Sequence, residues 1–179
     1  MKSNSEPAWI EAGYEIFAKE GPNGLKVEHV AKKVGISKSS FYHLFIDMEL
    51  FQEKLLQYHL KKAAEMQELA LEATNIDPEM IQILVSKKKE LLFQRQLCIH
   101  RDNEAFQTCF DKALSTVVEA FFQQWVSLLG LESQKHIAKT ILKVYTDNFF
   151  LRITEENLNV TWVRSLIQEI KLLVNDVRK

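Results

Sequence analysis

Apolar residues recur at intervals of three and four along almost the whole chain, which is the spacing of one face of an α-helix. The first such stretch covers residues 9–17 and ends at the turn-forming segment 21–24, which contains two glycines and a proline. Two short amphipathic stretches follow at 27–34 and 37–44, and Gly35 separates them. The pattern therefore predicts three short helices at the N-terminal end.

Longer helices joined by short connections are predicted for the rest of the chain. Asp47 is placed to cap a helix from residue 48 towards 73, and Asp77 to cap the next helix, with Pro78 at its first position. That helix is expected to reach about residue 99, and the later helices to occupy about 103–130, 133–154 and 161–177.

The composition agrees with a helical fold. Five Gly and three Pro in 179 residues is roughly half of average usage, whereas sheet proteins of this size need many turns rich in these residues. With 46% apolar and 26% charged residues, the chain is expected to be folded and not disordered. We therefore predict an all-α protein with a helix-turn-helix head over residues 1–47 and a larger helical body over residues 48–179.

We expect a cytoplasmic protein without membrane contact. The first residues carry charges and lack the apolar core of a signal peptide, and no long uncharged apolar run is present. The two cysteines, Cys98 and Cys109, would lie about 16 Å apart on one helix, which is too far for a disulfide. They are expected to be buried apolar residues.

Residues 27–45, VEHVAKKVGISKSSFYHLF, have the form of two short helices joined by a tight turn. Gly35 permits a backbone conformation open to few residues, and Phe41 with Phe45 would anchor the second helix. In a helix-turn-helix the second helix enters the major groove of DNA with its N-terminus first. The segment is therefore a candidate DNA-binding element.

The polar residues of the second helix would then point away from the core, where each can bond a phosphate or a base edge; they are Lys38, Ser39, Tyr42 and His43. Residues 26–45 hold four lysines and one glutamate, a net +3 within a chain of net charge −1. An ordinary helical hairpin with a solvated polar face fits the same pattern. Periodicity and charge alone leave both interpretations open.

Three co-linear segments between Trp9 and Leu55 resemble the DNA-binding head of the TetR/AcrR family of bacterial transcriptional regulators. They are IEAGYEIFAKEGPNGL, VEHVAKKVGISKSSFYHLF and DMELFQEKL. They follow the family's apolar first helix, its Gly-Ile-Ser-Lys turn, its Phe-Tyr-x-x-Phe recognition helix and the acidic-aliphatic start of its fourth helix. The resemblance implies a regulator and not an enzyme: a homodimeric repressor that binds a palindromic operator and releases it when a small effector binds.

The resemblance also assigns roles to single residues. Ser37 would cap the recognition helix, and the residues expected to contact double-stranded DNA are Lys26, Val27, Ser37, Lys38, Ser39, Ser40, Tyr42 and His43. Three positions depart from the family pattern. Lys26 stands where the family usually has threonine, and Ser39-Ser40 stands where the family usually has a small residue followed by Gly or Pro. Met48 stands where the family commonly has a lysine that contacts a phosphate. The Met48 departure supports an alternative function, a helical ligand-binding or protein-interaction module with weakened DNA affinity.

Aromatic residues crowd the chain after residue 90, and the body helices of this family enclose a ligand cavity. The resemblance thus predicts a cavity for a lipophilic or aromatic effector, lined by Phe93, Phe106, Phe110, Trp125, Tyr145 and Phe149. Plain core packing is the alternative for any one ring.

The last two predicted helices carry continuous apolar stripes, and family members pair these helices across a two-fold axis. The expected homodimer interface consists of Ile137, Ile141, Val144, Val163, Leu166, Ile167, Ile170 and Val174. Burial of the stripes in the chain's own core is the alternative.

His100 and Glu104 are spaced as metal ligands on one helix would be, but Asp102 and Asn103 predict a helix start between them. The motifs of phosphate-binding loops, dinucleotide sites, zinc proteases and serine hydrolases are absent from the sequence. We expect no metal, no cofactor and no enzymatic activity.

Overall fold

The computed structural model describes residues 6–177, and within them every regular element is helical, which confirms the all-α prediction. The elements are α1 (Glu6–Glu20), the 3-10 turn η1 (Pro22–Gly24), α2 (Val27–Val34), α3 (Lys38–Leu44), α4 (Met48–Glu72), the π-helical turn η2 (Ile76–Met80), α5 (Ile81–Ser86), α6 (Lys88–Ile99), α7 (Glu104–Leu129), α8 (Lys135–Arg152) and α9 (Val160–Val177).

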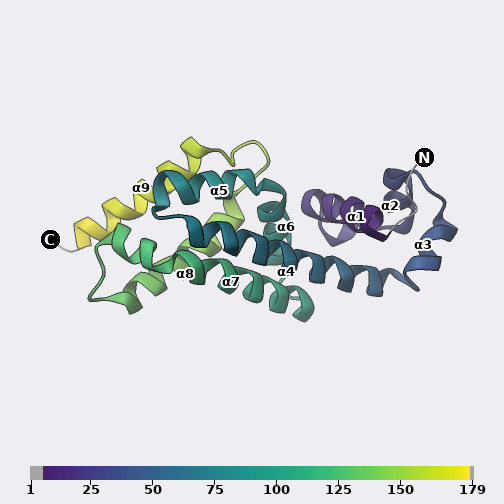
Figure 1. Cartoon of the computed structure of the whole chain (residues 1–179), viewed down its shortest axis with the longest axis horizontal. Coiled ribbons are helices and arrows are strands. Elements are labelled where there is room, and N and C mark those ends of the chain that lie inside the picture. Colours follow the sequence, from purple (N-terminus) through teal and green to yellow (C-terminus); the bar gives the residue numbers. More distant parts are fainter. Residues whose placement is uncertain (1–5, 178–179) are drawn as a thin grey trace.

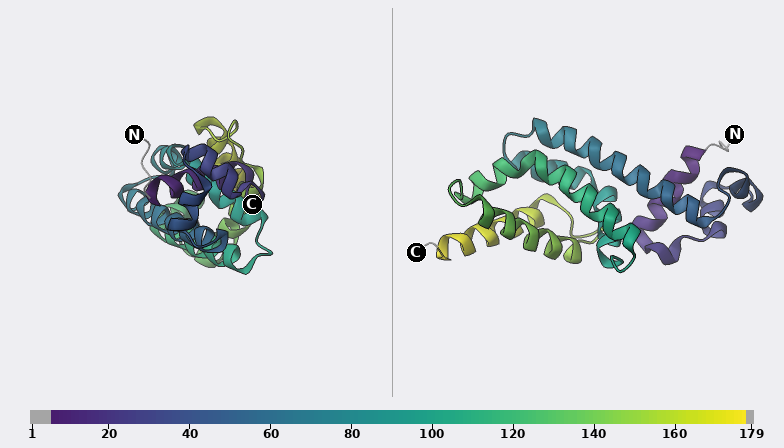
Figure 2. Two further views of the ribbon diagram at one scale, coloured as in Figure 1. Left: turned by 90° about the vertical axis from the view of Figure 1, so that its right-hand side faces the viewer. Right: turned by 90° about the horizontal axis from the view of Figure 1, so that it is seen from below.

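The molecule is elongated, with α1–α3 (the head) at one end and the last turns of α9 at the other (Figure 1). The body comprises α4–α9. Within it, α4 starts beside α3 and runs along α7, and the two long helices stay side by side when the molecule is turned (Figure 2). α6 packs against α1 and also against α7 and α8, so it joins the head to the body.

Aromatic packing fixes the recognition helix α3 to the rest of the head. Gly35 ends α2 in the left-handed region with φ of 77°, which turns the chain towards α3 as the sequence predicts. Phe41 and Phe45 are fully buried, and their rings lie 5.2 and 4.8 Å from the ring of Phe51 in α4. Gly13 of α1 lies so close to this ring that a Cβ would overlap it.

The predicted cap of α4 is confirmed, because the backbone N–H of Leu50 donates to Asp47 Oδ1 at 2.9 Å. The prediction for Asp77 is confirmed in its backbone position, since this residue is non-helical directly before Pro78, but its side chain does not cap the helix. Asp77 has an extended backbone, and its carboxylate accepts two hydrogen bonds from Arg164 of α9 at 2.7 and 2.8 Å. This carboxylate therefore joins η2 to α9.

The single helix predicted from residue 78 to 99 is broken in the structure. Lys87, with φ of −99° and ψ of 35°, separates α5 from α6. The break lets α5 pack against α9 while α6 turns to pack against α1. It is a tertiary effect, since no Gly or Pro marks the position in the sequence.

One buried apolar cluster extends from the head into the body, from Trp9 of α1 to Ile167 of α9. A second cluster fills the far end of the body around Trp125 and Leu142. None of the helices in residues 6–177 combines the length and apolar character needed to cross a membrane.

Candidate DNA-contacting face and internal cavity

The recognition helix α3 lies at the tip of the head (Figure 1). Phe41 is fully buried, whereas Lys38, Ser39, Tyr42 and His43 are exposed, with Tyr42 at 57%. The Tyr42 ring meets the buried Phe41 ring edge-on at 5.5 Å, which holds it against the helix. The structure therefore orients these polar side chains as the sequence pattern predicts.

Ser37 occupies the N-cap position of α3, but the prediction that its side chain caps the helix is wrong. Its hydroxyl shares hydrogen bonds with the hydroxyls of Ser39 at 2.9 Å and Ser40 at 3.2 Å. The three serines thus form a small hydroxyl cluster at the start of the helix.

The lysines of the head differ in their surroundings. Lys38 Nζ lies 2.8 Å from Glu28 Oε1 of α2, and this contact lowers the pKa of Glu28 and raises that of Lys38. Both side chains are more than half exposed, so a DNA phosphate can replace the carboxylate at little cost. Lys33 is paired with Glu15 of α1 at 2.8 Å. Lys26 precedes α2 and is exposed.

Three apolar residues complete this end of the molecule. Val27 and Met48 are partly buried and pack against the core, so the Val27 side chain is turned inward. Ile46, between α3 and α4, is 78% exposed. Ile46 could not be expected from the sequence, because an isolated apolar residue after Phe45 carries no periodic signal.

The body contains a cavity of about 100 Å³ between α4, α6, α7, α8 and α9. Its wall is almost wholly apolar and includes Met66, Met80, Leu114, Phe121, Trp125, Tyr145, Phe149 and Ile167. This volume is smaller than that of an engineered apolar cavity of about 150 Å³ in another protein, which binds benzene, so a small ring is the largest ligand that fits without some displacement of the wall.

The aromatic lining was only half predicted. Trp125, Tyr145 and Phe149 line the cavity, but Phe93, Phe106 and Phe110 do not. Phe93 stacks between head and body, Phe106 meets Phe17 edge-on at 5.5 Å, and Phe110 meets Phe150 at 5.6 Å. These three rings are core residues because helix packing, which the sequence does not display, directs them away from the cavity.

Polar residues that the sequence pattern did not reveal also line the cavity: Lys62, Glu90 and Thr146, together with His59 of α4 and Gln94 of α6. His59 and Gln94 are the two that are buried. They belong to a buried chain of hydrogen bonds that starts on the head. Tyr14 Oη of α1 lies 2.7 Å from His59 Nδ1, His59 Nε2 lies 2.6 Å from Gln94 Oε1, and Gln94 Nε2 donates to the carbonyl of Phe110 at 2.8 Å. Burial lowers the pKa of His59 to about 4, although its bond to Gln94 acts in the opposite direction.

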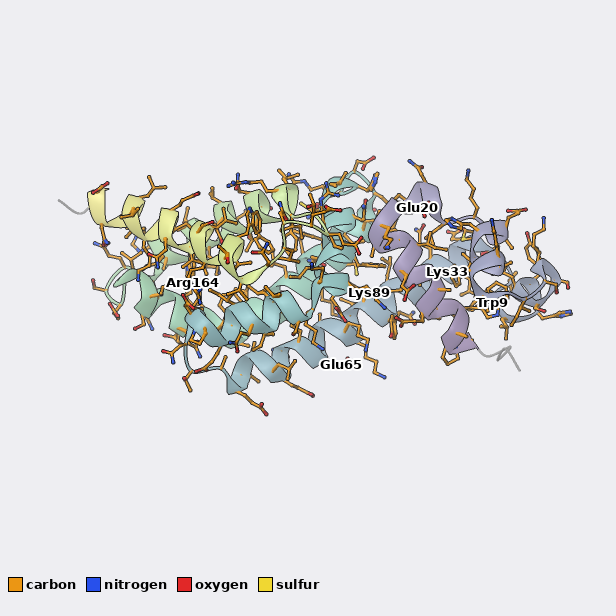
Figure 3. The ribbon with its side chains drawn as sticks, turned by 90° about the horizontal axis from the view of Figure 1, so that it is seen from above. Trp9, Glu20, Lys33, Glu65, Lys89 and Arg164 are labelled. Carbon is orange, nitrogen blue, oxygen red and sulfur yellow. The ribbon has the colours of Figure 1, made fainter. Side chains whose placement is uncertain are left out.

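A set of ion pairs borders the same contact between head and body at the surface. Lys89 of α6, labelled in Figure 3, lies beside α1. Its Nζ is 2.6 Å from Glu11 Oε1 and 3.1 Å from Glu15 Oε1 of that helix. Although partial burial opposes ionisation, the bonds to Lys89 and Tyr58 hold the pKa of Glu11 below its ordinary value. Lys54 and Lys19 make further pairs with Glu6 and Glu155. We call this group the surface ion-pair seam.

The predicted dimer stripe is only partly exposed. Val163, Leu166, Ile167 and Val174 are at most 9% exposed because α9 packs them into the chain's own core, so they are corrected to core residues. Ile141 and Ile170 are partly buried. Ile137 and Val144 of α8 are exposed, and they are joined by residues outside the prediction, Leu151 of α8 and Leu172 and Leu173 of α9.

The remaining candidates from the sequence are the two cysteines and the possible metal ligands His100 and Glu104. Cys98 and Cys109 are buried and unpaired, and burial raises the pKa of Cys109 to about 12. His100 directly follows the last residue of α6 and Glu104 is the first residue of α7, where Asn103 Oδ1 accepts from the N–H of Phe106 at 3.2 Å as a cap. Across residues 6–177, no group of three or more potential ligands is arranged to hold a metal ion.

Comparison with known proteins identifies the head. The family model of the bacterial regulatory proteins of the tetR family matches residues 10–53. No curated protein matches the chain significantly in sequence.

Solved structures resemble nearly the whole chain. A TetR/AcrR-family transcriptional regulator from Aquifex aeolicus VF5 is 21% identical with a TM-score of 0.64, covering 93% of this chain and 98% of its own. A protein from a Rhodococcus species assigned to the TetR family is 19% identical with a TM-score of 0.59, covering 93% and 96%. One from Mesorhizobium loti, assigned likewise, is 17% identical with a TM-score of 0.54, covering 95% and 93%.

At these identities the solved structures establish only the fold of the chain. The family model establishes that the head matches the tetR family of bacterial regulatory proteins. The head therefore belongs to the TetR family of bacterial regulatory proteins, and the chain has the fold of a TetR/AcrR-family transcriptional regulator, a family of DNA-binding regulators and not of enzymes.

Proposed function

We propose that the protein is a homodimeric transcriptional repressor in the cytoplasm, that each protomer reads one half of a palindromic operator with α3, and that a small uncharged ligand in the body cavity releases the DNA. The observation that carries the proposal is the outer face of α3. Its polar side chains are exposed at the tip of a TetR-family head, while Phe41 and Phe45 hold the helix rigidly from behind.

Lys38, Ser39 and the hydroxyl cluster with Ser37 and Ser40 form the leading end of α3, which enters the major groove in helix-turn-helix proteins. Hydroxyl and ammonium groups there can bond base edges and phosphates. Tyr42, His43 and Lys26 lie further out and are assigned to the DNA backbone. Val27 contributes its backbone N–H, because its side chain packs inward.

The second copy is proposed to bind along α8 and α9. Ile137, Val144 and Leu151 lie seven residues apart, so they form one line on α8, and they are 38%, 66% and 56% exposed. Leu172 and Leu173 add exposed apolar area on α9. Burial of such a continuous apolar surface stabilises a homodimer interface.

The ligand is proposed to act through α4. Met48 starts this helix next to α3, and His59, Ala63 and Met66 of the same helix line the cavity. Because the wall is almost wholly apolar, burying an unpaired charge there is unfavourable. The fit is therefore best for an uncharged ring of about benzene size.

Selection from random DNA duplexes at low salt tests the proposal. The full chain should enrich two inverted half-sites about one helical turn or a multiple apart, and binding should weaken steeply as salt rises. Lys38→Ala should reduce binding to the selected duplex, whereas the control Lys139→Ala, on α8, should not.

A chain that enriches no sequence contradicts the proposal. That outcome favours a ligand-binding or protein-interaction module with weakened DNA affinity, the function that the apolar, partly buried Met48 at the start of α4 would suit.

A further inference from the structure

The hydrogen bonds between Tyr14, His59 and Gln94 have one consistent direction. Gln94 Nε2 donates to the carbonyl oxygen of Phe110, so Gln94 Oε1 must be the acceptor towards His59. His59 therefore carries its proton on Nε2, and its bare Nδ1 accepts the hydroxyl proton of Tyr14. A neutral imidazole satisfies both neighbours, and we call these three residues the buried relay.

The relay is held in place by stacked rings. The Phe93 ring lies 4.5 Å from the His59 ring and 4.3 Å from the Tyr14 ring, at interplanar angles of 23° and 10°. Tyr14 is 1% exposed and His59 is 3% exposed, so both partners of their hydrogen bond are buried. A buried polar chain of this kind is strong when complete and unfavourable when interrupted.

The relay also forms part of the cavity wall. His59 and Gln94 line the cavity, whereas Tyr14 lies on α1 of the head and does not. One end of this series of hydrogen-bonded side chains therefore lies at the cavity, and the other end belongs to the head. Hydrogen bonds depend steeply on distance, and a 2.7 Å contact that opens to about 3.6 Å is no longer a hydrogen bond.

We propose that an uncharged ring filling the cavity displaces His59 and Gln94, breaks the hydrogen bond between Tyr14 and His59, and thereby loosens α1 from the body. Loosening α1 changes the position of the whole head, since α1 packs against α2 and Trp9 of α1 meets Phe41 of α3 edge-on at 5.7 Å. The consequence for operator binding rests on the proposed function; the coupling between cavity and α1 does not.

A second tie between the same helices provides a matched control. Tyr58 of α4 donates to Glu11 of α1 at 2.8 Å, but this bond lies in the more exposed contact between head and body, and Tyr58 does not line the cavity. Tyr14→Phe and Tyr58→Phe each remove one hydroxyl that joins α4 to α1. Only Tyr14→Phe removes a hydrogen bond of the buried relay.

Benzene is the probe for the first experiment, which uses the wild-type full chain. Nitrogen chemical shifts of ¹⁵N-labelled histidine report the protonation of His59, and hydrogen exchange reports the opening of α1 amides. In free protein His59 should show a protonated Nε2 and a bare, hydrogen-bonded Nδ1. Saturating benzene should shift Nδ1 towards a free imidazole nitrogen and speed exchange in α1 at least fivefold.

The two variants then show whether the relay transmits this effect. Both should still bind benzene, as thermal stabilisation by benzene records. The effect of benzene on α1 exchange should persist in Tyr58→Phe and fall below twofold in Tyr14→Phe. With a selected operator duplex, benzene should weaken binding by the wild type and Tyr58→Phe at least fivefold, and by Tyr14→Phe less than twofold.

Failure of benzene to bind the wild type, or a full effect of benzene on α1 in Tyr14→Phe, overturns the inference. If Tyr14→Phe does not fold, the nitrogen shifts of the wild type decide, and an unchanged Nδ1 with bound benzene overturns the inference as well. If no operator is selected, the proposed function fails, while the exchange and nitrogen measurements still decide the inference about the relay.

Discussion

Lowering the pH from 7 towards 4.5 is expected to destabilise the folded protein through the single imidazole of His59. Its folded pKa is about 4 because it is buried, whereas its ordinary value is 6.5. The unfolded chain therefore binds the proton first, and folding stability is lost as the pH falls through the window from about 6.5 to about 4. Above this window the group is neutral in both states and the contribution is fully present.

The magnitude follows from the gap between the two pKa values. Each pH unit in the window should lower the free energy of unfolding by about 1.4 kcal/mol, to a total near 3 kcal/mol. Domains are usually stable by about 5–15 kcal/mol, so the loss is large enough to measure by urea unfolding. Carboxylates that are paired with lysines, such as Glu11 and Glu15, have pKa values below their ordinary value of 4.5. Their contribution to folding stability is therefore lost at lower pH than that of His59.

Urea unfolding at half-unit steps from pH 7.5 to 4.5 provides the measurement, with His59→Gln as the control. Glutamine keeps a polar side chain at the position but has no titrating group in this range. The wild type should lose stability between pH 6.5 and 4.5, and the variant should show a nearly flat profile there. An equal slope in both proteins would refute the assignment to His59.

Three further predictions concern the surface and the core. Lys38→Ala should weaken operator binding by about 1–2 kcal/mol and reduce the salt slope by about one, as measured by fluorescence anisotropy at several salt concentrations; an unchanged slope would contradict a phosphate contact. Val144→Glu should convert the proposed dimer to a monomer in light scattering, whereas Lys139→Glu should not, and a monomeric wild type would refute the interface. Gly13→Ala should lower the free energy of unfolding by about 1–3 kcal/mol in urea, because its Cβ would overlap the Phe51 ring; unchanged stability would show that the ring moves freely.

The head could be predicted from the sequence because its signals are local. Gly35, Phe41, Phe45 and the Asp47 cap act within a few residues of their own positions, and the structure places them as expected. The hydroxyl of Ser37 was misjudged for a related reason. Its partners, the neighbouring serine hydroxyls, compete with the backbone N–H groups, and the cap preference of serine does not reveal that competition.

The cavity and the dimer surface could not be predicted because they depend on how helices pack. The stripe on α9 is real, but periodicity does not distinguish a helix buried in its own chain from one buried against a partner, and here Val163 and Ile167 are core residues. One signal was available for His59. It stands four residues after Leu55 and four before Ala63, on the buried line of α4, so its burial and its need for hydrogen-bond partners could have been inferred.

The surface ion-pair seam affects how a salt titration of DNA binding should be interpreted. In most DNA-binding proteins, the slope of log affinity against log salt counts the counterions released from phosphates. Here the pairs of Lys89, Lys54 and Lys19 with glutamates of α1 and of the body are partly exposed, so salt also screens the contact that orients the head. The measured slope then contains a contribution from the protein's own ion pairs, so it does not by itself give the number of phosphates contacted.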